Sequence, residues 1–240
     1  MSSARSIIIV GVGPFISTSL ARRLVVEGWN IALLSRSHDS LRALAEELNK
    51  QKAENAKILV KAVDAGDAGA LLQALEASKK ELGSVDVVCY NAARVGMDDL
   101  MTVKHEVLEA DFKVSAVGTL MTGQWFAENA NTSKVSDGEY PMLLVTGGLL
   151  HQHPLPSMSS LSAVKSASQN IATNFSQVLP EKYQVQVGQP LIEQAIIPDG
   201  KGGYQTKSDP DVIVDKIFMP YFEDRMNVGQ LKEWKLERVY

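Results

Sequence analysis

The chain has 240 residues, 45% of them hydrophobic, which is enough to form a sizeable buried core. Its formal net charge of −4 argues against a nucleic-acid or anionic-membrane partner. The single cysteine, Cys89, excludes a disulfide framework and a cysteine-based zinc site. The first apolar run is too short for a signal peptide or a membrane span, so we expect a cytoplasmic protein.

Short apolar runs alternate with amphipathic segments along the chain. The pattern predicts strand 6–10, helix 16–27, strand 31–34, helix 41–48, strand 58–63, helix 71–82, strand 85–90, helix 105–130, strand 142–145, helix 157–179 ending at Pro180, and strand 183–187. Such alternation indicates an α/β fold, with a doubly wound, Rossmann-like parallel sheet between two layers of helices. With no linker or internal repeat visible, we expect one domain over residues 1–240.

The weakly patterned part is residues 193–209, which include PDGKGGYQTKSDP. A segment so rich in glycine and lysine predicts a loop that serves as a substrate lid, to which Glu193 and Tyr204 would belong. The alternative is an ordinary surface loop.

In such a sheet, ligands bind beyond the carboxyl ends of the strands. The informative residues are therefore those that directly follow each strand. In chain order they read GVGPFIS, SRSHD, DAGD, NAARVG, TGGLLHQH and QPLIEQ.

Four features together resemble the short-chain dehydrogenase/reductase family over residues 6 to about 191. They are the first strand with its glycine loop, Asp64, the YNAA run, and the helix that carries Lys165. The TGG segment and SL-S-A-x-K are similar to an atypical branch of that family. Some fungal relatives on this fold serve natural-product pathways, and certain ones close rings as well as reduce.

The catalytic positions depart from the family pattern. The resemblance places the family's serine at Gly148, its tyrosine at Leu161 and its helix-four asparagine at Ser115, while its lysine is kept as Lys165. Leucine has no exchangeable proton and glycine has no hydroxyl. Losing general acid–base help costs about two to four orders of magnitude in rate.

The glycine loop departs as well. Gly11 and Gly13 can make the tight turn, but Phe15 and Ser17 replace the family's second and third glycines. Those glycines let the backbone approach a pyrophosphate, so a benzyl group there should crowd a dinucleotide. We therefore expect no cofactor, or NADP bound weakly. The alternative is that Phe15 points into the core and that binding survives.

Other cofactor features persist. Arg36 follows the second strand where no acid is present, which suits the 2′-phosphate of NADP. The resemblance makes Asp64 an adenine contact, Asn91 a neighbour of the adenosine ribose and Lys165 a ribose contact. The alternatives are a solvated charge for Arg36 and a strand cap for Asn91.

Several side chains could replace the missing acid. His151 and His153 follow the fifth strand, and histidine exchanges protons near neutral pH. Arg94 is placed to orient a polar substrate group, and a desolvated Lys165 can act as a base. Asp98 is a proton carrier or a helix N-cap. No third ligand accompanies the histidine pair, so no metal site is expected.

Apolar residues near the same mouth predict a hydrophobic substrate pocket, although some could be ordinary core. The candidate pocket residues are Met97, Gly148, Leu149, Leu155, Met158, Leu161 and Tyr204. Met101 and Leu150 belong to the same apolar set.

Three hypotheses follow. The first is an enzyme that performs a non-redox step, such as cyclisation, isomerisation or dehydration, on a small hydrophobic molecule. The second is an NADP-dependent reductase with substitute acids, and the third is a non-catalytic binding or scaffold protein. Because family members commonly pair their long helices, we also expect a homodimer or homotetramer. The apolar residues offered for that interface or for the core are Phe112, Val114, Trp125, Phe126, Ile171 and Phe175.

Overall fold

The computed structural model describes residues 5–193, 197–198, 204–205 and 208–240. Its main sheet consists of parallel strands in the order β3-β2-β1-β4-β5-β7-β10, with the two-residue β6 beside β7. These are β1 (Ser6–Val10), β2 (Asn30–Ser35), β3 (Ile58–Ala62), β4 (Val87–Tyr90), β5 (Met142–Val145), β6 (Gly147–Gly148), β7 (Gln186–Ile192) and β10 (Glu237–Val239). The predicted doubly wound parallel sheet is confirmed.

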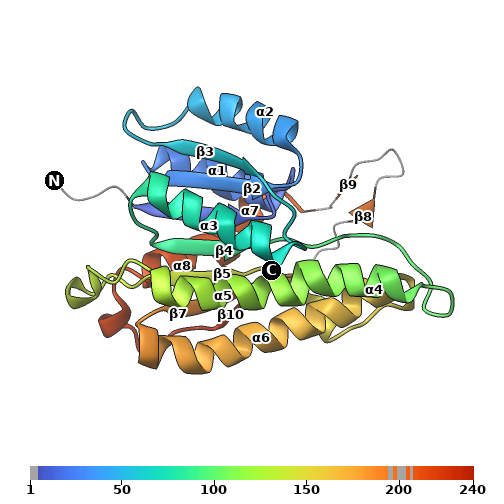
Figure 1. Ribbon diagram of the computed structural model, residues 1–240. Coiled ribbons are helices and arrows are strands. Elements are labelled where there is room, and N and C mark those ends of the chain that lie inside the picture. The colour runs from blue at the N-terminus through green and yellow to red at the C-terminus, as the bar shows by residue number, and fades with distance from the viewer. Residues whose placement is uncertain (1–4, 194–196, 199–203, 206–207) are drawn as a thin grey trace.

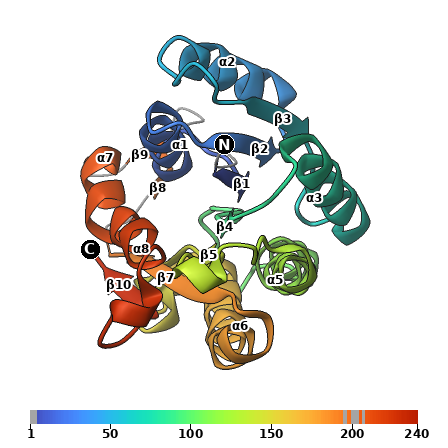
Figure 2. The ribbon, with the colours of Figure 1, turned by 90° about the vertical axis from the view of Figure 1, so that its left-hand side faces the viewer.

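Helices cover both faces of the sheet (Figures 1 and 2). One layer contains α1 (Ile16–Val26), α2 (His38–Asn49), α7 (Pro210–Ile213) and α8 (Met219–Asp224). The other contains α3 (Ala68–Leu82), α5 (Gly118–Asn129) and α6 (Ser159–Tyr183), with α4 (His105–Phe112) preceding α5. Alternate residues of β1 divide between the two cores: Ile7 and Ile9 face the first layer, and Ile8 and Val10 the second.

Three predicted elements differ from the structure, and several observed elements were not predicted. The helix expected over 105–130 contains a π-helical segment, Lys113–Val117, between α4 and α5. The helix expected to stop at Pro180 runs on to Tyr183 and ends where Gln184 adopts φ 58°. The last predicted strand lies later, at Gln186–Ile192. Finally, α7, α8 and β10 form in a region to which the sequence assigned no element.

Most of the predicted lid falls outside the described residues. Within it, β8 (Ile197–Pro198) and β9 (Tyr204–Gln205) pair as a short antiparallel ladder. The side chain of Tyr204 is not among those described, so its place in the substrate pocket stays a prediction, as does the lid itself.

The sheet order fixes where a ligand can bind. From β1 the chain moves outward to β2 and β3, and then returns to place β4 on the other side of β1. The loops that leave β1 and β4 therefore diverge at the carboxyl edge, which creates a crevice there. In the described part of the chain, no helix is long and apolar enough to cross a membrane.

Candidate active site

A cavity of about 590 Å³ opens at this carboxyl edge. It is continuous from the glycine loop to the first turns of α6, so one space joins the region of a dinucleotide and that of a substrate. Its lining comes from residues 10–17, 34–36, 63–65, 91–95, 146–150 and 192–193, with Val114, His153, Leu155, Met158, Leu161 and Lys165.

The glycine loop is held by a close backbone approach. Gly11 adopts φ +85°, and a Cβ atom built on it would lie 2.3 Å from the Cα of Ala92. The side-chain amide of Asn91 donates to the carbonyl oxygen of Gly11 at 3.0 Å, so Asn91 ties this loop to the end of β4. By contrast, a Cβ on Gly13 would meet no atom within 4 Å. Only Gly11 is required to be glycine by the surrounding atoms.

Ser17 and Phe15 are both accommodated in the loop. The buried hydroxyl of Ser17 accepts a hydrogen bond from the Gly13 amide at 2.8 Å. Phe15 has a negative φ of −110°, packs partly against the core beneath α1, and also borders the cavity. The ring is therefore shared between core and cavity wall, and the expected crowding of a dinucleotide stays a prediction.

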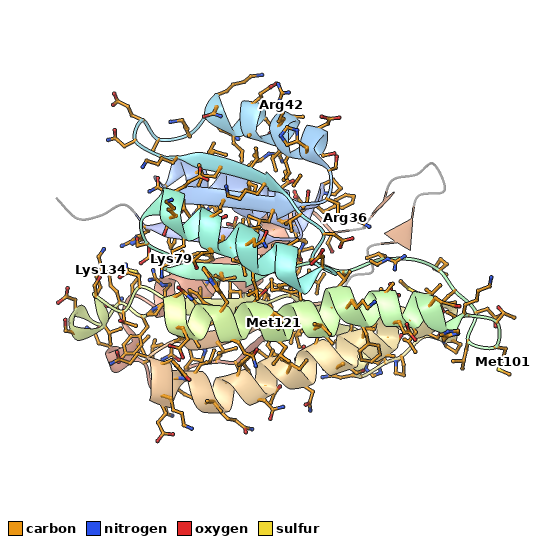
Figure 3. All side chains as sticks on the ribbon, viewed as in Figure 1. Arg36, Arg42, Lys79, Met101, Met121 and Lys134 are labelled. Atoms are coloured by element: carbon orange, nitrogen blue, oxygen red, sulfur yellow. The ribbon has the colours of Figure 1, made fainter. Side chains whose placement is uncertain are left out.

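The residues expected to contact the adenosine half of a cofactor line the same cavity. They are Arg36, Asp64 and Asn91. One Asp64 oxygen accepts the amide of Gly66 at 2.9 Å, which fixes the turn after β3. Arg36 is exposed at the carboxyl edge of the sheet and forms no ion pair with any described residue (Figure 3). Its guanidinium is thus available to an anionic ligand.

Leu161 forms part of an apolar wall at the other end. It is 5% exposed and packs in a cluster with Met158 and Val164, against which Leu150 and Phe112 also lie. Gly148 lines the cavity nearby with an extended backbone, and a Cβ there would lie 3.1 Å from the carbonyl oxygen of Ile192. Neither position offers a hydroxyl group.

Lys165 follows Leu161 by one helical turn and lines the same cavity. Its Nζ donates to the carbonyl oxygen of Thr146 at 3.1 Å. Burial lowers the pKa of this amine to about 8. In the described part of the chain no carboxylate forms an ion pair with this amine, so no nearby negative charge offsets the lowering of its pKa by burial.

Some of the other candidate residues line the cavity and some do not. His153 lines the cavity, whereas His151 does not; its Nδ1 lies 2.8 Å from the carbonyl oxygen of Gly148, to which it donates as the Nδ1–H tautomer. Leu149 and Leu155 line the cavity, whereas Met97 is 61% exposed and lies outside the lining. The substrate pocket itself stays a prediction. Met101 sits at the outer tip of the loop before α4 (Figure 3).

Asp98 lies outside the cavity lining and is engaged as a helix cap. Its carboxylate accepts the Ser159 amide and hydroxyl, both at 2.7 Å, and the Ser160 amide at 3.0 Å. Partial burial alone would raise the pKa of Asp98, but these three donors outweigh it and leave the pKa below its ordinary value. Of the two roles offered for Asp98, the structure shows the contacts of a helix N-cap.

Arg94 borders the cavity and pairs with an acid that the sequence analysis missed. Its Nε lies 3.5 Å from an oxygen of the buried Asp111, and the Ser160 hydroxyl donates to the other oxygen at 2.6 Å. Asp111 is on α4, so no local spacing could have indicated this pair. The described residues contain no group of three side chains able to hold a metal ion.

The protein-family comparison matches residues 5–190 to the short chain dehydrogenase model. The chain belongs to the short-chain dehydrogenase family. An alcohol dehydrogenase of the archaeon Thermococcus sibiricus, solved with 5-hydroxy-NADP, is similar in structure, with a TM-score of 0.79, 19% identity, and coverage of 99% of this chain and 96% of that one. A metagenomic short-chain oxidoreductase solved with NADP has a TM-score of 0.77 and 19% identity, covering 100% of this chain and 98% of that one. A short-chain dehydrogenase from Rhodopseudomonas palustris has a TM-score of 0.76 and 14% identity, covering 98% and 97% respectively.

Although the chain belongs to this family, several of its residues differ from the family pattern at the catalytic positions. A short-chain dehydrogenase fold is present over its whole sheet, yet the positions that resemble the family's serine and tyrosine hold Gly148 and Leu161. Ser115, where the resemblance places an asparagine, is buried in the π-helical segment. Its hydroxyl finds no partner among the described residues. Of these four positions, Lys165 alone keeps the residue type of the family pattern, and it lines the cavity.

Proposed function

We propose that this chain uses its short-chain dehydrogenase cavity for a non-redox step on a small hydrophobic molecule: a cyclisation, an isomerisation or a dehydration. The observation that carries the proposal is the buried Leu161 in its apolar cluster, with Lys165 one turn away and no hydroxyl at position 148 or 161. A carbonyl oxygen bound there would lack the donors that hydride transfer needs, but an apolar substrate would be well enclosed.

The side chains of this cavity have complementary tasks in such a step. Leu149, Leu161 and Met158 would bind apolar carbon and exclude water. Arg94, braced by Asp111, would orient a carbonyl or anionic oxygen. Lys165, whose pKa of about 8 lies close to neutrality, would take or give the proton. Positioning together with one or two proton-transfer groups is sufficient for steps of this kind.

A second candidate is an NADP-dependent reductase, and specific observations favour it. Arg36, Asp64 and Asn91 line the end of the cavity where a nucleotide would lie, and the first turn of α1 has no side-chain cap. Free helix N-terminal amides suit a phosphate, so these residues fit the adenosine and phosphate portions of NADP. Bound there, the cofactor would supply hydride chemistry, which this chain's own residues would have to assist through Lys165 or His153.

The two candidates are separated by restoring the missing hydroxyls. If the site is a reductase that lost its acid, the Leu161→Tyr, Gly148→Ser double variant should oxidise NADPH with simple ketones. If the cavity is reassigned, that variant should gain no such activity, and ligand affinity should fall by roughly 1–3 kcal/mol because a phenol adds bulk and an unpaired polar group.

The matched control is the Leu161→Phe, Gly148→Ser variant, which has the bulk of the tyrosine without its hydroxyl. The serine introduced at position 148 in both variants needs a small shift, since its Cβ would lie 3.1 Å from the Ile192 carbonyl oxygen. Ketone-dependent NADPH oxidation by the tyrosine variant alone would refute the non-redox proposal. A calorimetric titration of the unaltered protein with NADPH completes the test, with weak or no binding expected.

A further inference from the structure

The amine of Lys165 has an unusual combination of access and isolation. It faces a cavity of about 590 Å³, and its hydrogen bond to the Thr146 carbonyl oxygen occupies one of its donor positions. The preceding turn of α6 presents the buried Leu161 on the same side, so no phenol stands between the amine and the cavity.

No charge partner holds the amine in its protonated form. The charged or titratable side chains that share its cavity are Arg36, Asp64, Arg94, His153 and Glu193. None of these is within ion-pair distance of its Nζ in the structure described here. On α6 itself, the next turn offers the uncharged Gln169, which is engaged with Gln189 and Glu237.

This isolation makes the lysine a nucleophile at neutral pH. With a pKa of about 8, roughly one molecule in ten carries a neutral Lys165 at pH 7. An ordinary lysine, with a pKa near 10.4, is neutral in only about one molecule in 2,500. Desolvation in an apolar pocket is a recognised way to activate a lysine for attack on carbonyl substrates.

We propose that Lys165 forms a covalent imine with an aldehyde or ketone group of the hydrophobic substrate. The Nζ lone pair attacks the carbonyl carbon, and the carbonyl π pair moves to oxygen, which takes up a proton. The carbinolamine then loses water as the nitrogen lone pair forms the C=N bond. Carbonyl and amine give imine and water, so no oxidant or reductant is consumed.

The imine explains how a redox-free site could still do demanding chemistry. Once protonated, it withdraws electrons from the neighbouring carbon, which allows a proton to leave that carbon and a double bond to shift or water to be eliminated. His153 and Glu193 line the same cavity and would carry these protons. The inference thus rests on the proposed non-redox function and names its substrate class as a carbonyl compound.

The test is reductive trapping. The full chain is incubated without nucleotide with 3-phenylpropanal, or with the smaller propanal, and cyanoborohydride, and each lysine's adduct is measured by peptide mass spectrometry. Lys182, exposed near the end of the same helix, is the internal reference. At pH 7.5 we expect Lys165 to be labelled at least about tenfold faster than Lys182, with the ratio falling as pH approaches 10 because ordinary amines then become neutral.

Matched variants assign the adduct. Lys165→Met should abolish the fast site, whereas Lys182→Arg should leave it intact; circular dichroism of both verifies folding. No Lys165 adduct with either aldehyde, under conditions that modify Lys182, would overturn the imine. Labelling of Lys165 no faster than that of Lys182 would do the same.

A parallel incubation with NADPH in place of cyanoborohydride separates this inference from the proposed function. If NADPH is consumed and 3-phenylpropanol appears, the non-redox function is wrong, whatever the trapping result. If NADPH is untouched and Lys165 is trapped, both proposals are supported. If NADPH is untouched and Lys165 stays unlabelled, the imine alone is refuted.

Discussion

Replacing Lys165 with methionine should change how the stability of the protein depends on pH. Burial lowers the pKa of this lysine from 10.5 to about 8 in the folded chain. Between these values the unfolded state binds more protons than the folded state, so the stability of the wild type rises with pH through this group. The methionine variant has no such group, and its stability lacks this rise.

The magnitude follows from the two pKa values. Below pH 8 the folded chain must bury a charged amine, and the full penalty of about 3 kcal/mol applies. Between pH 7 and pH 9.5 about 2 kcal/mol of that penalty is relieved as the buried amine loses its proton. Contributions that do not depend on pH, such as the lost hydrogen bond to Thr146, cancel in this difference.

Urea unfolding of both proteins at several pH values measures the effect. The free energy of unfolding of the wild type should gain about 2 kcal/mol on that of Lys165→Met between pH 7 and pH 9.5. A Lys182→Met variant, altered on the exposed face of the same helix, provides the background. Parallel pH profiles for the wild type and Lys165→Met would show that the amine is not desolvated, and the argument for its neutral form would fail.

Four further outcomes are expected. Asp98→Ala should lower the free energy of unfolding by about 1–2 kcal/mol because it removes the cap of α6, and this loss should shrink below about pH 4, where the carboxylate of the wild type is protonated. Asp99→Ala, which removes one contact with a backbone amide, should lose less in the same urea assay. Gly11→Ala should cost about 2–4 kcal/mol because of its positive φ and its contact with Ala92, while Gly13→Ala has room for its Cβ and should be tolerated; equal losses would contradict the loop geometry. If NADPH binds, Arg36→Ala should weaken it far more than NADH in calorimetry, and equal effects would show that Arg36 does not contact the 2′-phosphate. Light scattering should give a dimer or tetramer, and a monomer would refute the predicted association.

Some of the apolar residues offered for an interface or for the core take the core alternative. Phe126 is fully buried and Val114 is 8% exposed, and both pack inside this chain's own core. Phe175 packs against Gly123 of α5, where a Cβ would lie 2.2 Å from its ring, so α5 and α6 already cover each other. The exposed large apolar residues here are instead Val117, which ends the π-helical segment, and Leu120 of α5.

Apolar periodicity predicted the sheet well, because each inner strand is buried on both faces and reads as a continuous hydrophobic run. It failed for β7, whose sequence QVGQPLI contains a glycine and a proline. Gly188 is required there, since a Cβ would lie 2.7 Å from both Leu144 and Tyr221. Pro190 lies opposite Arg238 of β10. The residues that make this segment a strand are therefore distant in sequence, and no local pattern shows them.

The candidate site also has features that the sequence could predict and features that it could not. Position after a strand was enough to predict that Asn91, Arg94 and Gly148 would share one cavity, because the sheet brings its carboxyl ends together. Lys165, which is on a helix, was placed there by the family resemblance. The sequence offered Asp98 as a helix N-cap but could not show that the capped helix is α6, nor that Asp111 braces Arg94. Those roles depend on how α6 packs against α4 and against the loop before α4, which lie 49 to 62 positions away in the sequence.

The absence of a hydroxyl at position 161 has a structural consequence beyond the lost proton donor. A phenol beside Lys165 would offer the amine a second polar neighbour and would need one itself. Leu161 instead contributes apolar surface to the cavity that Lys165 also lines. The amine donates to the Thr146 carbonyl oxygen, and desolvation by burial is the cause of its lowered pKa. Under the imine proposal, the position that lacks the family's acid therefore lies beside a lysine whose pKa is lowered by burial, so one side chain, Leu161, would bear on both the lost proton donor and the proposed lysine chemistry.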